Sequence, residues 1–120
     1  MMLGDETDAT ILWRISVRDS PRPHRGHWLE QAKDGQVQDS RELTHKRLVL
    51  GRGDEADWKL VSAQASRQHA EIVLEGDEYR VTDMESRNGL FLNEVRIHSA
   101  LLRDGDVIQI GDVMLRYRES

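Results

Sequence analysis

Three short clusters of this 120-residue chain place an arginine beside hydroxyl, amide or glycine residues. At each cluster the chain passes between an apolar stretch and a polar one, which is typical of a strand that meets a loop. A guanidinium can donate two parallel N–H bonds to an anion, and hydroxyl, amide and loop backbone groups can add further donors. If the fold brings the clusters together at one end, they form a socket for a doubly charged anion. The clusters are Gly51-Arg52-Gly53, Ser66-Arg67-Gln68-His69-Ala70 and Ser86-Arg87-Asn88-Gly89.

The residues around the clusters follow the pattern of short β-strands. Apolar and polar residues alternate along Ile11–Arg18 and again along Ala70–Glu75, and a period of two is typical of half-buried strands. Further strands are predicted at Arg41–Leu50, Tyr79–Val81, Leu90–Leu92, Val107–Ile110 and Val113–Tyr117. Turns are predicted at Glu75–Asp77, Asn93–Glu94, Arg103–Asp106 and Gly111–Asp112. A short buried segment is expected at Trp58, Leu60 and Val61. Because no stretch shows a convincing helical period, the pattern predicts an all-β sandwich or barrel.

The polar stretch His24–Ser40 is the least informative part of the chain. Its segment Trp28–Lys33 is expected to form at most a helical turn. His24 and His27 are three residues apart, a spacing that a metal ion can use. Without further ligands nearby, both are expected to be solvated loop histidines, and we expect neither a metal nor a cofactor.

Composition limits the classes of protein to which the chain can belong. A length of 120 residues favours one domain, and the absence of cysteine excludes disulfides and thiolate metal sites. A net charge of −5 argues against a general nucleic-acid-binding protein. No apolar run approaches the roughly 20 residues that span a bilayer. Met1–Thr10 is acidic and unlike a signal peptide, so we expect a flexible tail at residues 1–10, a domain at residues 11–118 and a cytoplasmic location.

The order and spacing of the clusters resemble those of the forkhead-associated (FHA) domain family. The resemblance covers roughly Leu48–Tyr117, and the Ile11–Val17 strand would complete the expected size. It implies a sandwich of two antiparallel sheets whose loops at one end bind phosphothreonine peptides. The motif segments are Gly51-Arg52, Ser66-Arg67-Gln68-His69-Ala70, Asp83 with Ser86-Arg87-Asn88-Gly89, and Asp104-Gly105-Asp106 before Ile108-Gln109-Ile110-Gly111.

The resemblance also implies a role for each matching residue. Arg52 and Ser66 match residues that hold the phosphate, and Asn88 matches an asparagine that holds the peptide backbone. Arg67 stands at a position that often contacts phosphate or peptide, and Arg87 stands where the family often has a threonine that touches phosphate. The residues with implied structural roles are Gly51, His69 and Gly89, of which His69 braces the loops and the glycines form tight turns.

Three positions depart from the usual family pattern. Gly53 stands where a polar residue is common and so removes one potential donor to the phosphate. Leu90 replaces a threonine, and Glu94 stands where a glycine is usual. None of these changes removes the core set, and Arg67 and Arg87 can strengthen the positive field.

Short motifs in the chain also suggest functions other than phosphopeptide binding. Ser66 and His69 could suggest a nucleophile and its base, but no acidic partner or strand–turn–helix elbow accompanies them, so we do not expect an enzyme. The tripeptide Arg52-Gly53-Asp54 is one that some cell-surface receptors bind, but a role in adhesion would require the protein to be secreted, and the sequence shows no export signal. A mononucleotide site at Gly51-Arg52-Gly53 lacks the third glycine and the following helix. An FHA-fold interaction or dimerisation module without phosphopeptide binding stays open.

The expected partner is a phosphothreonine-containing protein, either a Ser/Thr kinase or its substrate, with no nucleic acid and no membrane. Thr7 and Thr10 lie among acidic residues, so a phosphorylated tail could occupy the site of its own domain or of a neighbour.

Overall fold

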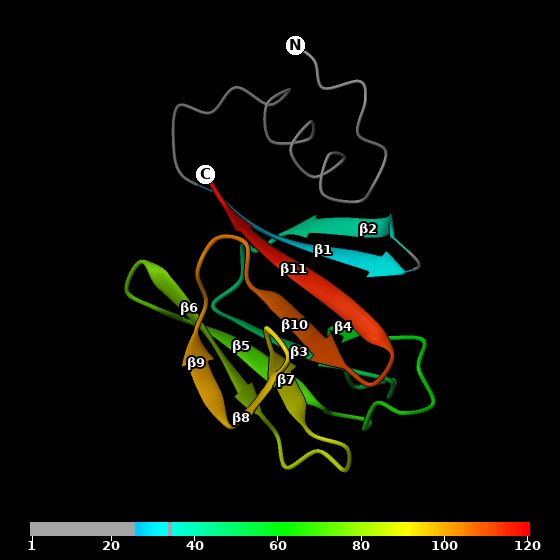
Figure 1. Cartoon of the computed structure of the whole chain (residues 1–120). Coiled ribbons are helices and arrows are strands. Elements are labelled where there is room, and N and C mark those ends of the chain that lie inside the picture. Colours follow the sequence, from blue (N-terminus) through cyan, green and yellow to red (C-terminus); the bar gives the residue numbers. More distant parts are fainter. Residues whose placement is uncertain (1–25, 34) are drawn as a thin grey trace.

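The computed structural model describes residues 26–33 and 35–120. Within these residues, eleven strands form two sheets that pack face to face (Figure 1). The strands are β1 (His27–Lys33), β2 (Gln36–Glu42), β3 (Arg47–Gly51), β4 (Trp58–Lys59), β5 (Ala70–Glu75), β6 (Glu78–Asp83), β7 (Leu90–Leu92), β8 (Val95–Ile97), β9 (Ser99–Leu101), β10 (Val107–Ile110) and β11 (Val113–Glu119). One sheet has the order β2-β1-β11-β10-β7-β8 and the other β4-β3-β5-β6-β9. The predicted all-β sandwich is confirmed.

Tight turns between the strands need residues that tolerate positive φ. Gly76 joins β5 to β6 with φ 63°, and Gly111 joins β10 to β11 with φ 61°. The β7–β8 turn uses Asn93 and Glu94 instead, with φ 50° and 71°. The Asn93 side chain stabilises this turn because its Oδ1 accepts the Val107 N–H at 2.9 Å. The turns predicted at these positions are therefore confirmed.

The core lies between the two sheets and is built from the inward residues of both. Alternation explains its composition, since every second residue of a strand points to the same face. The largest fully buried side chains are Trp58, Tyr117, Leu29, Leu50, Leu60, Ile72, Leu90, Leu102, Ile108, Ile110 and Leu115. They join both sheets into one hydrophobic cluster, which holds the strand ends in place.

The helical turn expected at Trp28–Lys33 is wrong, because this segment belongs to β1. β1 pairs with β11 on one side and β2 on the other, so six of its residues are in register with Met114–Glu119. The strand is polar because only one of its faces meets the core, where Leu29 is fully buried. Pairing on both edges outweighs the weak local preference.

His27 is not the solvated loop histidine that was expected. It begins β1 and is half-buried, and its Nδ1 lies 2.5 Å from the Tyr117 hydroxyl oxygen.

Two other expectations near the site need correction. Val61 was expected to be buried, but its side chain is 89% exposed. Leu60 points into the core, so the next residue of an extended chain points outward. Arg41–Leu50 is not one strand, because β2 ends at Glu42 and β3 begins only at Arg47.

Some expectations fall on residues that the structure does not describe. The tail at residues 1–10, the Ile11–Arg18 strand and His24 lie outside the described residues. The boundary of the domain at residue 11 therefore remains a prediction, as does a role for Thr7 or Thr10.

Glu30 of β1 is a buried carboxylate, only 3% exposed, and its Oε1 accepts no hydrogen bond from the described residues. The nearest guanidinium nitrogen of Arg118 is 4.0 Å away. Burial raises the pKa of Glu30 to about 7, although the charges of Arg118 and Arg116 oppose this effect and Asp104 adds slightly to it. Between about pH 4.5 and 7, Glu30 therefore keeps a proton in the folded state that it has lost in the unfolded chain.

We predict that Glu30→Gln stabilises the protein above neutral pH. The contribution of Glu30 to stability is fully present below its unfolded pKa and is lost as the pH rises through its folded pKa. Removing the charge should therefore raise the free energy of unfolding by up to about 3 kcal/mol at about pH 8, and by little at about pH 4.5. Urea denaturation at both pH values measures the effect, with the exposed Glu78→Gln as the control. A less stable Glu30→Gln protein at the higher pH would mean that the arginines outweigh the cost of burial.

Candidate functional site

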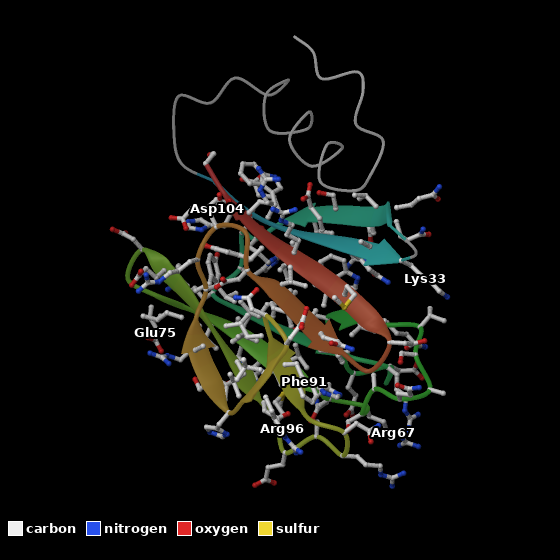
Figure 2. All side chains as sticks on the ribbon, in the orientation of Figure 1. Lys33, Arg67, Glu75, Phe91, Arg96 and Asp104 are labelled. Atoms are coloured by element: carbon white, nitrogen blue, oxygen red, sulfur yellow. The ribbon has the colours of Figure 1, made fainter. Side chains whose placement is uncertain are left out.

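Three loops meet at the end of the sandwich where β3 ends and β5 and β7 begin. The first loop follows Gly51, the second leads into Ala70 and the third precedes Leu90. Figure 2 shows Arg67 and Arg96 at the lower end of the view, on the other side of the molecule from Asp104. Hydrogen bonds between the loops make the three clusters neighbours in the fold.

Backbone hydrogen bonds join the first loop to the second. The Arg52 N–H donates to the Ser66 carbonyl at 3.0 Å, and the Gly53 N–H donates to the Arg67 carbonyl at 3.1 Å. Gly51 makes this close approach possible, since a Cβ at position 51 would lie 2.0 Å from the Arg67 carbonyl oxygen. A side chain there would push the two loops apart.

The buried side chain of His69 connects the second loop to the third from the core side. Its ring is fully buried, and its Nδ1 accepts the Ser66 N–H at 3.0 Å. Because Nδ1 is an acceptor, Nε2 carries the proton and donates to the Gly89 carbonyl at 2.7 Å. The His69 N–H also donates to Leu50 at the end of β3, at 2.8 Å. One neutral imidazole thus links two loops above the end of a core strand.

The third loop contacts the second at two further points. The Arg87 N–H donates to Ser66 Oγ at 3.0 Å, and Asn88 Nδ2 donates to the Gln64 carbonyl at 2.7 Å. Gly89 has φ 93°, and a Cβ there would lie 2.8 Å from Arg96 Nε. The positive φ favours glycine at this position, whereas the flexible Arg96 side chain could move away from a Cβ.

The Arg52 and Ser66 side chains are held by the loops and keep donors available. Arg52 Nε donates to the Ala65 carbonyl at 2.7 Å, which orients the guanidinium and leaves its two terminal amino groups for another acceptor. Ser66 Oγ accepts the Arg87 N–H, so its own hydrogen can be donated elsewhere. Arg52 also lines an open hollow, together with Gly53, Asp54, Glu55 and Arg67.

Exposure divides the candidate residues into two groups. Arg52, Arg67, Arg87 and Asn88 are exposed and Ser66 is half-buried, so all five can reach a ligand. The second group, Gly51, His69 and Gly89, is buried. The structure brings together the five residues expected to bind, above the three expected to be structural.

The geometry does not fit a serine nucleophile with a histidine base. Both ring nitrogens of His69 are occupied, Nδ1 by the backbone N–H of Ser66 and Nε2 by the carbonyl of Gly89. The Ser66 hydroxyl oxygen instead accepts from Arg87. Among the residues that the structure describes, no group of three or more His, Asp or Glu side chains could hold a metal ion.

Some residues that shape the site were not assigned a role in the sequence. Asp83 Oδ1 accepts the Ser86 N–H at 3.2 Å, and Ser86 Oγ accepts the Gly89 N–H at 3.0 Å. The Asp-x-x-Ser spacing is a signal for such a side-chain-capped turn. The backbone carbonyl of Gln64 accepts the bond from Asn88, a role that the type of its side chain does not reveal. The Ser62 hydroxyl donates to the Asp112 carboxylate and so links the loop after β4 to the β10–β11 turn.

Comparisons with known proteins agree with this geometry. A family model described as "FHA domain" matches residues 48–111, which is just over half of the chain. The chain is 43% identical over 65 residues to the glycogen accumulation regulator GarA of Mycolicibacterium smegmatis, covering 54% of this chain and 41% of GarA. It thus spans about two-fifths of the length of that relative.

Solved structures have the same fold. One, from work on phosphothreonine-dependent FHA domain interactions, has a TM-score of 0.70 and 29% identity, covering 78% of this chain and 95% of the other. Another, the FhaA FHA domain complexed with the intracellular domain of Rv3910, has a TM-score of 0.67 and 29% identity, covering 77% and 99%.

We predict that His69→Ala destabilises the whole loop end. The Ser66 N–H and the Gly89 carbonyl would lose their buried partner, which costs about 1–3 kcal/mol for each group. Thermal or urea unfolding should show a loss of about 3 kcal/mol, partly restored in His69→Gln, whose amide can also accept and donate. The exposed His45→Ala is the control. Equal stability of His69→Ala and His45→Ala would disprove the bracing role.

Proposed function

The chain belongs to the FHA domain family, and on this premise we propose that it binds a phosphothreonine-bearing segment of a partner protein and catalyses no reaction. One observation carries the proposal. Guanidinium, hydroxyl and amide groups from three separate loops lie on one rim, above buried residues that hold the loops together. A phosphothreonine brings about −1.5 to −2 charges and three acceptor oxygens to such a rim.

Each rim residue has a distinct role in this proposal. Arg52 donates its terminal amino groups to two phosphate oxygens, as a bidentate guanidinium can and an ammonium cannot. Ser66 donates its hydroxyl hydrogen to a third oxygen. Arg67 and Arg87 add positive charge from neighbouring loops. Asn88 aligns the peptide backbone beside the phosphothreonine, with its own Nδ2 anchored on Gln64.

The expected affinity follows from the number of contacts. A hydrogen bond to a charged group contributes about 1.5–3 kcal/mol. Three or four of them, less the cost of ordering a flexible peptide, leave roughly 8 kcal/mol and about micromolar affinity. The loops are already joined to one another, so the protein itself contributes little to the ordering cost. Such a site binds reversibly, as a reader of phosphorylation requires.

The proposed partner is a Ser/Thr kinase or one of its substrates, and the proposed location is the cytoplasm. The similarity to a protein described as a regulator is consistent with a binding role. The residues that the structure describes include no helix long and apolar enough to cross a bilayer.

We predict that Arg52→Ala removes phosphopeptide binding and leaves the fold intact. Losing both phosphate contacts should weaken binding by about 100-fold or more, whereas stability should fall by only about 1 kcal/mol through the lost bond to Ala65. Isothermal titration with matched phosphothreonine, phosphoserine and unphosphorylated peptides measures the first quantity, and urea unfolding measures the second. The control is Arg103→Ala, an exposed arginine that does not line the site.

Two results would contradict this function. One is equal affinity of the wild type for phosphorylated and unphosphorylated peptides. The other is an Arg52→Ala protein that binds the phosphopeptide as tightly as Arg103→Ala does. Either result would favour an interaction module that does not read phosphate.

A further inference from the structure

The loop after Arg52 carries two carboxylates beside the proposed phosphate site. Asp54 and Glu55 line the same hollow as Arg52 and Arg67, and both are exposed. The protein therefore presents acidic and basic groups side by side, within reach of one bound peptide.

The two carboxylates differ in their partners. Asp54 accepts a hydrogen bond from Lys59 at 2.6 Å. That bond and the Lys59 charge lower the pKa of Asp54, with a smaller contribution from Arg67. Glu55 forms no ion pair with any residue in the described ranges 26–33 and 35–120. Its charge is therefore available to a ligand.

The balance of charge changes when a phosphate binds. A phosphothreonine of about −1.5 to −2 neutralises most of the positive charge of Arg52 and Arg67. Asp54, Glu55 and Lys59 remain beside it and together carry a net charge of about −1. A peptide side chain that extends along this loop then meets a negative environment, although the empty site is positive.

We propose that Asp54 and Glu55 select phosphothreonine segments that place an arginine or lysine beside the phosphothreonine, on the side of this loop. The same carboxylates disfavour an acidic residue or a second phosphate at that position. This inference rests on the proposed phosphothreonine binding and specifies the class of partner. The enzyme that creates the binding site must then be a kinase that accepts a basic residue near its target threonine.

Coulomb's law sets the size of the effect. Two unit charges about 6 Å apart in water change an equilibrium constant about threefold, so replacing glutamate by arginine in the peptide should change affinity about tenfold. The preference should shrink as salt is added, because these groups are exposed. The phosphate itself remains the dominant determinant, because its bonds to Arg52 and Ser66 are direct.

A peptide series on the full chain tests the proposal. The phosphothreonine peptides differ at one flanking position at a time, which carries Arg, Ala or Glu, and isothermal titration or fluorescence anisotropy gives their affinities. They are tested against the wild type, an Asp54→Asn/Glu55→Gln double variant and Glu94→Gln. Glu94 is an exposed carboxylate in the β7–β8 turn and serves as the control for loss of a negative charge.

The expected result is a position at which Arg binds about tenfold better than Glu in the wild type and in Glu94→Gln. In the double variant the positive charge of Lys59 remains without its carboxylate partner, so this preference should be lost or reversed, while the difference between phosphorylated and unphosphorylated peptides persists. A wild type that shows no such position overturns the selectivity alone, as does a double variant that keeps the full preference. A wild type that does not distinguish phosphorylated peptides overturns the proposed function and this inference with it.

Discussion

The buried imidazole of His69 is the interaction on which the arrangement of the loops depends. A neutral histidine can accept with one ring nitrogen and donate with the other, and here both bonds go to backbone groups of different loops. The residue is also fixed at the end of β3, because its backbone N–H donates to the Leu50 carbonyl. The positions of two loops are therefore set by one fully buried side chain, and Gly51 sets the first loop against the second by allowing close contact.

This arrangement separates support from binding. The supporting residues are buried, and their hydrogen bonds are satisfied within the protein. The candidate binding residues are exposed or half-buried, and the side chains of Arg52, Ser66 and Asn88 are each held by an internal bond that leaves other hydrogen-bonding groups available. Arg52 is oriented through Nε, Ser66 through its acceptor oxygen and Asn88 through Gln64. The entropic cost of binding then comes mainly from ordering the peptide, because the loops are already held in position.

Much of this could be predicted from the sequence, and the failures have physical causes. Local residue types determine the glycine turns and the three clusters. The turns at Gly76 and Gly111 and the grouping of the three loops could therefore be predicted. β1 was missed because its pairing with β2 and β11 is a tertiary effect that its polar residues do not reveal. The prediction that Val61 is buried was wrong because the apolar character of a residue does not determine which face of the chain it occupies near the end of a strand. Buried Glu30 and the Gln64 carbonyl depend on distant strands and on backbone direction, and neither has a local signal.

Binding at this rim is tested most directly by mapping the backbone amide signals of the isotopically labelled chain by NMR while a phosphothreonine peptide is added. We expect the largest shifts at Arg52, Ser66, Arg67, Arg87 and Asn88. We also expect His69 to keep its proton on Nε2 and the unphosphorylated peptide to cause no such change. Shifts confined to the outer faces of the sheets, or equal shifts with both peptides, would contradict phosphothreonine binding at this rim.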